Sequence, residues 1–335
     1  MHPQRTGVAE NIFYERYGTN EDALVLFIHG GVGGLYTYVT GKLHQRQRKY
    51  YGSAESQAPM YKAFIKEIVS GDRCSVLAYD RRGCGNSRVR TGDENVWYSM
   101  LDLCDDIICL LRHHGWLSKR IHVIGTSAGG PIAMHFAMRY PARVQSLALL
   151  NTAADLSKAS KDIRYFKDNI YLKIKDSPSS ENQFYRDKNI DSRIRSSLLK
   201  KILDGNPDYV PGGEGLSQNE VMEMIEQISV KEMRDVVWKS QNRNISVYFR
   251  DSAISKWKLR NIPTIIIHGS LDTVIPYSAG IELYKILKSE LVSFHTIEGF
   301  GHGVVESVEC QLLVSKFLDE IGFMEERVVG TNSRL

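Results

Sequence analysis

The chain has 335 residues, a length that suits a single α/β domain carrying an insertion. With 42% hydrophobic and 24% charged residues it can form a sizeable core, which excludes a wholly disordered protein. Its 43 basic and 39 acidic residues give a net charge of +4, too close to balance to indicate nucleic acid or an anionic membrane as a partner.

The N-terminus lacks an apolar stretch of signal-peptide length, and no run of about 18 apolar residues occurs in the chain. We therefore expect neither membrane insertion nor secretion by that route. An odd number of cysteines without the spacing of a disulfide framework indicates reduced thiols inside a cell. These cysteines are Cys74, Cys84, Cys104, Cys109 and Cys310. No metal and no cofactor are expected.

Short apolar runs alternate with helix-length amphipathic segments through residues 10–150, a pattern typical of βαβ units and a largely parallel sheet. The predicted strands here are residues 12–17, 24–28, 75–79, 121–124 and 146–150. The predicted helices are residues 61–69, 95–113 and 132–139. In the helix at 95–113 the predicted apolar face carries Leu101, Ile108 and Leu111. Its aspartates are predicted to face solvent, namely Asp102, Asp105 and Asp106.

The strand signals fade over residues 155–244, where charges and tyrosines rise and residues 204–217 form a turn-rich break. We expect this part to be a helical cap. Alternation then resumes, with predicted strands at 264–267 and 291–297 around a helix at 281–288. The predicted fold class is therefore α/β, with a mostly parallel central sheet flanked by helices and a helical cap insertion. Its core comprises residues 1–154 and 245–335.

A second insertion is predicted at residues 35–60, between a glycine-rich turn and a helix. Loops of this length inside a compact domain are usually functional or disordered. The sequence leaves open whether this one is a solvated loop or a wall of the substrate pocket.

The strongest chemical signal is the G-x-S-x-G pattern at residues 125–129, which lies between a predicted strand and a predicted helix. Such a strand-to-helix turn exposes the serine hydroxyl above the sheet, and its flanking glycines avoid clashes with nearby backbone. The helix N-terminus adds N–H donors and a positive dipole end. The pattern also occurs by chance, but in this context it predicts Ser127 as a nucleophile.

A serine nucleophile needs a base and a group that orients the base. His302 lies in a glycine-flanked loop after the last predicted strand, and Asp272 follows the strand before it. A lone histidine is more often structural, and a loop aspartate more often forms a turn. The order serine, aspartate, histidine nevertheless matches that of hydrolases with this turn, so His302 is the predicted base and Asp272 the predicted acid.

Acyl transfer also needs an oxyanion hole made of two backbone N–H groups. Ala128, directly after the nucleophile, is predicted to supply one. The glycine-rich segment at residues 29–34 is predicted to supply the other, with Gly31 as first choice and Val32 as the alternative. A nucleotide-phosphate loop is a weaker reading of this segment, because the required lysine and glycine spacing is missing. His29 is expected to be structural.

Taken together, these motifs resemble those of α/β-hydrolase fold enzymes across most of residues 10–323. Residues 79–87 are similar to the D-x-R-G-x-G-x-S turn of that family, and residues 137–151 resemble its helix-to-strand passage after the nucleophile. The glycine-rich segment and this turn further resemble the proline iminopeptidase branch. Val32 and Ala128 stand where that branch usually has proline and tryptophan, which disfavours peptidase activity.

The resemblance and the serine together predict a serine hydrolase that cleaves a small or medium carboxylic ester, lactone or thioester through an acyl-serine intermediate. The alternatives are an aminopeptidase or amidase, a C–C hydrolase or lyase, and a ligand-binding protein that keeps the fold without turnover. Related dehalogenases and epoxide hydrolases use a carboxylate at the position of Ser127. The expected partner is a small-molecule substrate.

The final residues, Ser333, Arg334 and Leu335, resemble the C-terminal peroxisomal address whose type form is Ser-Lys-Leu. In a eukaryote this predicts recognition by a peroxisomal import receptor and peroxisomal localisation. Otherwise a cytoplasmic protein is expected.

Overall fold

The computed structural model describes residues 3–30, 59–82, 87, 99–156, 259, 261–272 and 275–325. Almost all of the predicted cap at 155–244 and of the predicted insertion at 35–60 lies outside these ranges. Gly31, Val32 and the C-terminal tripeptide also lie outside them.

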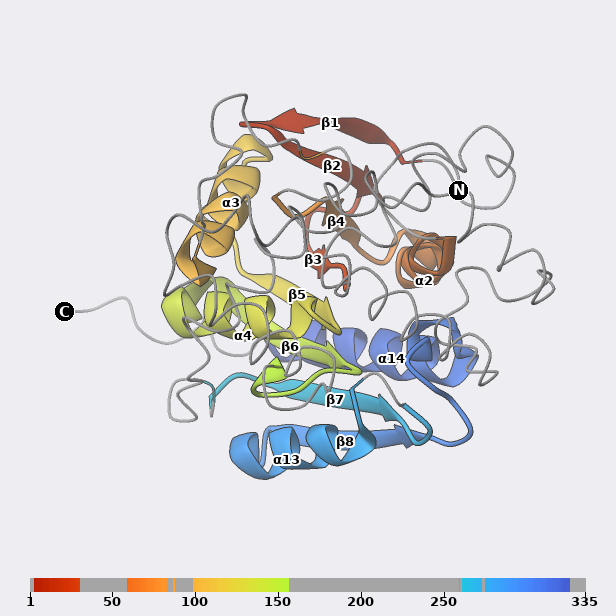
Figure 1. Ribbon diagram of the computed structural model, residues 1–335. Helices are drawn as coiled ribbons and strands as arrows, with labels where there is room; N and C mark the ends of the chain where they lie inside the picture. The colour runs from red at the N-terminus through yellow and green to blue at the C-terminus, as the bar shows by residue number, and fades with distance from the viewer. Residues whose placement is uncertain are drawn as a thin grey trace, which may run out of the picture.

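The described residues form one eight-stranded sheet with the strand order β1-β2-β4-β3-β5-β6-β7-β8 (Figure 1). β1 pairs with β2 and β2 pairs with β4 in antiparallel fashion, and the remaining neighbours are parallel. This arrangement confirms the predicted α/β class with a mostly parallel sheet. The strands are β1 (Arg5–Ala9), β2 (Ile12–Tyr17), β3 (Leu24–Ile28), β4 (Ser75–Tyr79), β5 (Ile121–Thr126), β6 (Val144–Leu150), β7 (Thr264–Gly269) and β8 (Val292–Ile297).

The predicted bounds of β2, β3 and β4 coincide with the observed ones. β5 and β7 run two residues further at their C-terminal ends, and β6 begins two residues earlier. β1 was missed because it is an edge strand in which only Ala9 is buried, so its apolar signal is weak.

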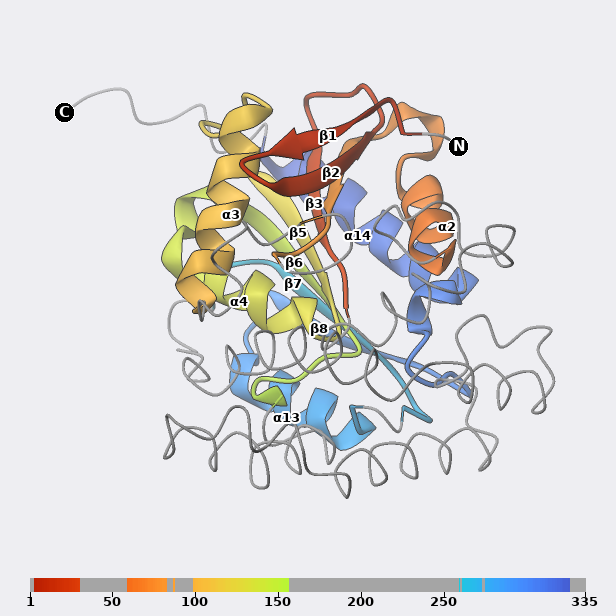
Figure 2. The same cartoon turned by 45° about the horizontal axis from the view of Figure 1, so that its top comes forward.

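Helices cover both faces of the sheet (Figures 1 and 2). α3 (Met100–His113), α4 (Gly129–Arg139) and α13 (Tyr277–Leu287) lie on one face, and α2 (Pro59–Ile68) and α14 (Val308–Glu325) lie on the other. Within the described residues, three short 3₁₀ turns are present at Ser70–Asp72, Pro141–Arg143 and Val304–Glu306. Alternate residues of β3 therefore enter different cores: Leu26 packs on the α3 and α4 side, and Phe27 packs on the α2 and α14 side.

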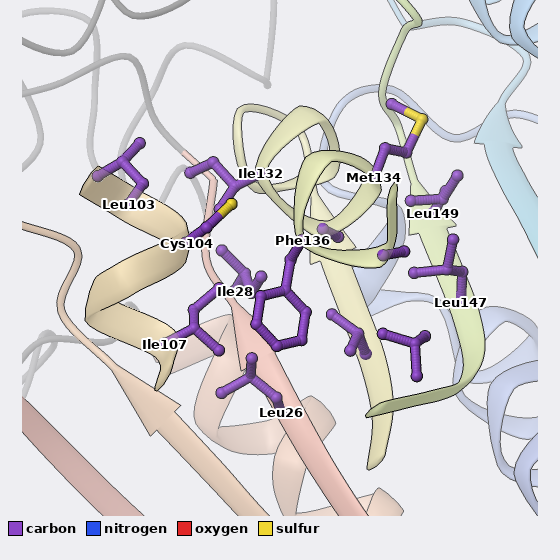
Figure 3. Close-up of a cluster of buried hydrophobic side chains, with 14 of the residues drawn as sticks. Leu26, Ile28, Leu103, Cys104, Ile107, Ile132, Met134, Phe136, Leu147 and Leu149 are labelled. Carbon is purple, nitrogen blue, oxygen red and sulfur yellow. The ribbon is translucent and has the colours of Figure 1, made fainter. Parts of the chain in front are cut away.

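The core between α3, α4 and the sheet fixes the position of α4 (Figure 3). Phe136 of α4 lies there with Ile107 of α3 and Leu26 of β3, and all three side chains are fully buried. Burial of each such side chain stabilises the fold by about 1.5–3 kcal/mol. The N-terminus of α4 is thereby held at the C-terminal end of β5, where the predicted nucleophile lies.

The structure corrects the predicted faces of the helix at 95–113. Its described part starts at Met100, after a capping box formed by Ser99 and Asp102. Leu101, which was predicted to lie on the buried apolar face of the helix, is 48% exposed. The buried stripe instead follows the helical period from Met100 and includes Leu103, Cys104, Ile107, Leu110 and Leu111.

Asp106 was predicted to be solvated, and this prediction was wrong. The residue is 6% exposed, and its carboxylate accepts two hydrogen bonds from the Arg82 guanidinium, at 3.0 and 2.6 Å. Burial raises the pKa of Asp106, and the hydrogen bonds from Arg82 partly offset this effect. The pair links the turn after β4 to α3, a contact between distant segments that periodicity does not reveal.

The four cysteines within the described ranges carry free thiols. Within the same ranges, no helix is both long and apolar enough to cross a bilayer. These residues also contain no cluster of histidine, cysteine and carboxylate side chains that could hold a metal ion.

Replacing Arg82 by methionine leaves the buried Asp106 carboxylate without these two hydrogen bonds. We expect Arg82→Met to lower the free energy of unfolding by about 2 kcal/mol at neutral pH. The loss should shrink as the pH falls through the raised pKa of Asp106, because a protonated carboxyl needs no cation. Denaturant unfolding across a pH series measures both effects. Lys316→Met, which removes an exposed ion pair with Glu320, is the control and should change little. Equal losses in acidic and neutral buffer would contradict this account.

Candidate active site

Ser127 occupies a sharp turn between β5 and α4. Its φ angle is 50°, a left-handed value that residues other than glycine adopt rarely. The turn is held because the Ser127 N–H donates to the Leu150 carbonyl at 2.9 Å. Local strain of this kind persists where the surrounding structure enforces it, and it often marks functional positions.

The glycines after the serine allow α4 to approach the sheet closely. A Cβ atom on Gly129 would lie 2.2 Å from the Ile28 carbonyl oxygen, and one on Gly130 would lie 2.2 Å from Thr152 Oγ1. Real Cβ atoms essentially never come this close to another heavy atom. The pattern at residues 125–129 therefore needs glycine at position 129 because of nearby backbone, as the sequence indicated, and Gly130 after it is confined by the Thr152 side chain.

The structure brings the three predicted catalytic side chains into one hydrogen-bonded chain. His302 Nε2 lies 2.9 Å from Ser127 Oγ, and His302 Nδ1 lies 2.8 Å from Asp272 Oδ2. An ionised carboxylate can only accept, so the Nδ1 atom carries the proton and, in a neutral ring, Nε2 accepts from the serine hydroxyl. This tautomer is the one that a general base requires.

Asp272 is fixed by further contacts around its carboxylate. Oδ1 accepts the Ile275 N–H at 2.9 Å, and Oδ2 lies 3.4 Å from Nε2 of the fully buried His268. Burial alone would raise the pKa of Asp272, but hydrogen bonds from His268 and His302 outweigh it and lower the pKa to about 2. The carboxylate is therefore ionised at neutral pH.

Opposite the serine, the segment after β3 is held by buried polar groups. The Gly30 carbonyl oxygen lies 2.7 Å from His29 Nδ1 and accepts from Arg81 Nη2 at 3.2 Å. His29 Nε2 in turn accepts the Arg81 backbone N–H at 3.1 Å. Burial and the Arg81 charge lower the pKa of His29 to about 3, so this histidine is neutral. Both its ring nitrogens bind backbone, as expected for a structural residue.

The Gly30 N–H is also engaged, since it donates to the Tyr61 hydroxyl at 3.3 Å. Of the two predicted oxyanion donors, Ala128 lies directly after Ser127 at the N-terminal end of α4 and is fully buried. The other, Gly31, and its alternative, Val32, lie outside the described residues.

Sequence reasoning assigned no role to His268, Arg81 or Asn151, which the structure places around the site. His268 is adjacent to Asp272 in space although it precedes it by four residues. Arg81 is 1% exposed, an unusual burial for arginine that no local pattern reveals. A polar residue immediately after a buried strand was the one signal available for Asn151.

Gly129 and Gly322 provide a test of whether close packing requires glycine at position 129. Gly129→Ala should lower the free energy of unfolding by about 2 kcal/mol or more, because the added methyl group meets the Ile28 carbonyl. Gly322→Ala, in α14, meets nothing within 4 Å and should raise it by about 0.5 kcal/mol. Denaturant unfolding of both variants measures the difference, and a Gly129→Ala variant as stable as the parent would refute the argument.

Comparison with known proteins gives partial relatives in sequence. RutD of Pantoea ananatis, provisionally named a carbamate hydrolase, is 37% identical over 76 residues, which cover 23% of this chain and 26% of that protein. Proline iminopeptidase PfmaB of Pestalotiopsis fici is 29% identical over 140 residues, covering 42% of this chain and 40% of that protein. The chain thus aligns with less than half the length of either relative.

The similarity in structure extends over nearly the whole chain. The meta-cleavage product hydrolase CumD of Pseudomonas fluorescens IP01, solved as a mutant with bound acetates, matches with a TM-score of 0.60 at 18% identity. The match covers 95% of this chain and 98% of that one, and at this identity it speaks for the fold alone. The family profile described as alpha/beta hydrolase fold matches residues 23–307. The chain therefore belongs to the α/β hydrolase fold family.

Proposed function

We propose that this α/β hydrolase cleaves a small or medium carboxylic ester, lactone or thioester through an acyl-serine intermediate. The observation that carries the proposal is the chain of hydrogen bonds from Ser127 through His302 to Asp272, at 2.9 and 2.8 Å. A serine hydroxyl is a weak nucleophile unless such a base adjoins it.

In the proposed reaction, Ser127 Oγ attacks the substrate carbonyl while its proton passes to His302 Nε2. The tetrahedral intermediate then collapses, and the leaving alcohol or thiol takes that proton. A water molecule next attacks the acyl-serine, losing a proton to His302, which returns it to Ser127 Oγ as the acid product leaves. Each step needs only the three side chains, water and an oxyanion hole.

The electrostatics of Asp272 support this role. With its pKa lowered to about 2, the carboxylate stays ionised through the neutral range and stabilises the imidazolium that forms on His302. It also holds the ring in the required tautomer. A protonated acid at this position would do neither.

The contacts of Gly30 favour an oxyanion donor further along the glycine-rich segment. Its own N–H is bound to Tyr61, so it is not offered to a substrate. Its carbonyl oxygen is held by His29 and Arg81. We propose the amide of Gly31, with Val32 as the alternative, together with the amide of Ala128.

The alternative functions differ from this proposal in the bond that is cleaved. An aminopeptidase or amidase is the main alternative, because PfmaB is named a proline iminopeptidase and the chain shares that branch's glycine-rich pattern. RutD's name adds carbamates as candidates. C–C cleavage, a lyase reaction and ligand binding without turnover remain alternatives, because the same fold hosts many chemistries.

Labelling with a fluorophosphonate, followed by intact mass, tests the nucleophile. We expect one label on the native protein and none on Ser127→Ala. Asp272→Asn should label about 10⁴-fold more slowly, because the asparagine amide favours the wrong histidine tautomer. No labelling of the folded native protein would overturn the proposed reaction and favour the ligand-binding alternative.

A pair of chromogenic substrates separates the ester hydrolase from the peptidase. We expect kcat/KM for p-nitrophenyl butyrate to exceed that for prolyl p-nitroanilide by about 10²-fold or more, with both activities lost in Ser127→Ala. Faster cleavage of the anilide would reassign the protein to the iminopeptidase alternative. The Ser127→Ala variant controls for background hydrolysis.

A further inference from the structure

The last residue of β6 and the two residues after it contact all three segments that carry the proposed catalytic side chains. The Leu150 carbonyl accepts the Ser127 N–H at 2.9 Å, and Thr152 Oγ1 donates to the Ser127 carbonyl at 2.7 Å. Between them, Asn151 reaches the loops of the acid and the base. The C-terminal end of β6 therefore holds the segments of all three side chains in place.

Asn151 uses every hydrogen-bonding group of its side chain. Its Oδ1 atom accepts the Gly269 N–H at 2.8 Å, and its Nδ2 atom donates to the carbonyls of Gly301 and His302 at 2.9 and 2.7 Å. Its backbone N–H donates to the Ile267 carbonyl at 2.9 Å. The residue is fully buried, so water does not replace these bonds.

From these contacts we infer that Asn151 is a positioning residue that sets the distance between the histidine loop and the acid loop. Gly269 ends β7 and lies three residues before Asp272, whereas His302 is held through its own carbonyl. The amide therefore connects the backbone on both sides of the His302–Asp272 hydrogen bond. This inference rests on the proposed function and adds a residue to it.

The hydrogen bonds made at position 151 require an asparagine side chain. One planar group must supply an acceptor to one loop and two donors to another, and a carboxamide does this where a carboxylate has no donor. The backbone of Asn151 has a φ angle of 44°, which asparagine tolerates better than most residues. Aspartate would keep the shape but set a carboxylate oxygen against two carbonyl oxygens.

The expected effect is on the chemical step. If the His302 backbone shifts, its ring moves relative to Ser127 Oγ and Asp272 Oδ2 together, and a displacement of about 1 Å can cost about 10²-fold in rate. Asn151 acts through His302, so substrate affinity should change little. A fall in kcat with KM nearly unchanged is the expected signature.

The test compares Asn151→Asp with the native protein and with Ser146→Ala. Ser146 is a buried residue of β6, the strand that precedes Asn151. Its hydroxyl lies 2.7 Å from His122 Nδ1, away from the triad, and it controls for a lost buried hydrogen bond. The measurements are the rate constant of fluorophosphonate labelling, kcat and KM for p-nitrophenyl butyrate, and thermal unfolding. Asn151→Asp should label about 10²-fold more slowly at neutral pH, whereas Ser146→Ala should lose stability but keep the native rate.

A pH series adds a readout that loss of stability alone would not change. Protonation turns the introduced carboxyl into a donor, so the rate of Asn151→Asp relative to the native protein should recover as the pH falls. The ionisable groups nearest to position 151 are His268, Asp272 and His302, and both proteins carry them, so the ratio of the two rates is compared at each pH. Asn151→Ser, which is uncharged and keeps one donor, provides a milder variant if Asn151→Asp does not fold, and an intermediate loss of rate is expected for it.

The outcomes separate this inference from the proposed function. If the native protein does not label, the proposed function fails first. If the native protein labels and the folded Asn151 variants label at the native rate, the positioning role is overturned. A loss of rate that matches the fraction unfolded, or that Ser146→Ala shares, would show that Asn151 serves stability alone.

Discussion

The hydrogen bond between Ser127 and His302 joins side chains 175 positions apart in the chain, and the rest of the site is arranged around it. It forms because β5, β6, β7 and β8 are parallel neighbours, so the loops after their C-terminal ends meet along one edge of the sheet. Ligands of open α/β sheets bind at such edges. The packing of α4 against β3, which leaves no room for a side chain on Gly129, fixes the height of Ser127 above that edge.

Buried polar groups then decide the electrostatic state of the site. Asp272 is surrounded by donors and remains a carboxylate, whereas His29 lies beside the buried Arg81 and remains neutral. In both cases the protonation state is set by the groups that lie next to the buried side chain. Hydrogen-bond donors stabilise the Asp272 carboxylate, and the positive charge of Arg81 disfavours a charged His29. The fixed negative charge of Asp272 next to His302 suits the formation of an imidazolium on that ring.

Much of the fold could be read from the sequence because its signals are local. Apolar periodicity marked β2, β3 and β4 with their observed bounds, and the glycine pattern around Ser127 indicated a strand-to-helix turn. These local patterns did not predict burial where it depends on a residue far away in the sequence. Asp106 cannot be told from the other aspartates of its helix by periodicity, because it is buried by contact with Arg82 on another segment. Edge strand β1 carries too little buried surface to show a pattern.

The sequence by itself determined the α/β class and the family, and it indicated the three side chains proposed to carry the chemistry, because each of these depends on short patterns and their order. The tertiary structure alone decided how those side chains are held. The contacts of Asn151 with Gly269 and His302 span 118 and 151 positions. Such bonds follow from the order of strands in the sheet, which no local pattern encodes, and so their residues become visible only when the chain is folded.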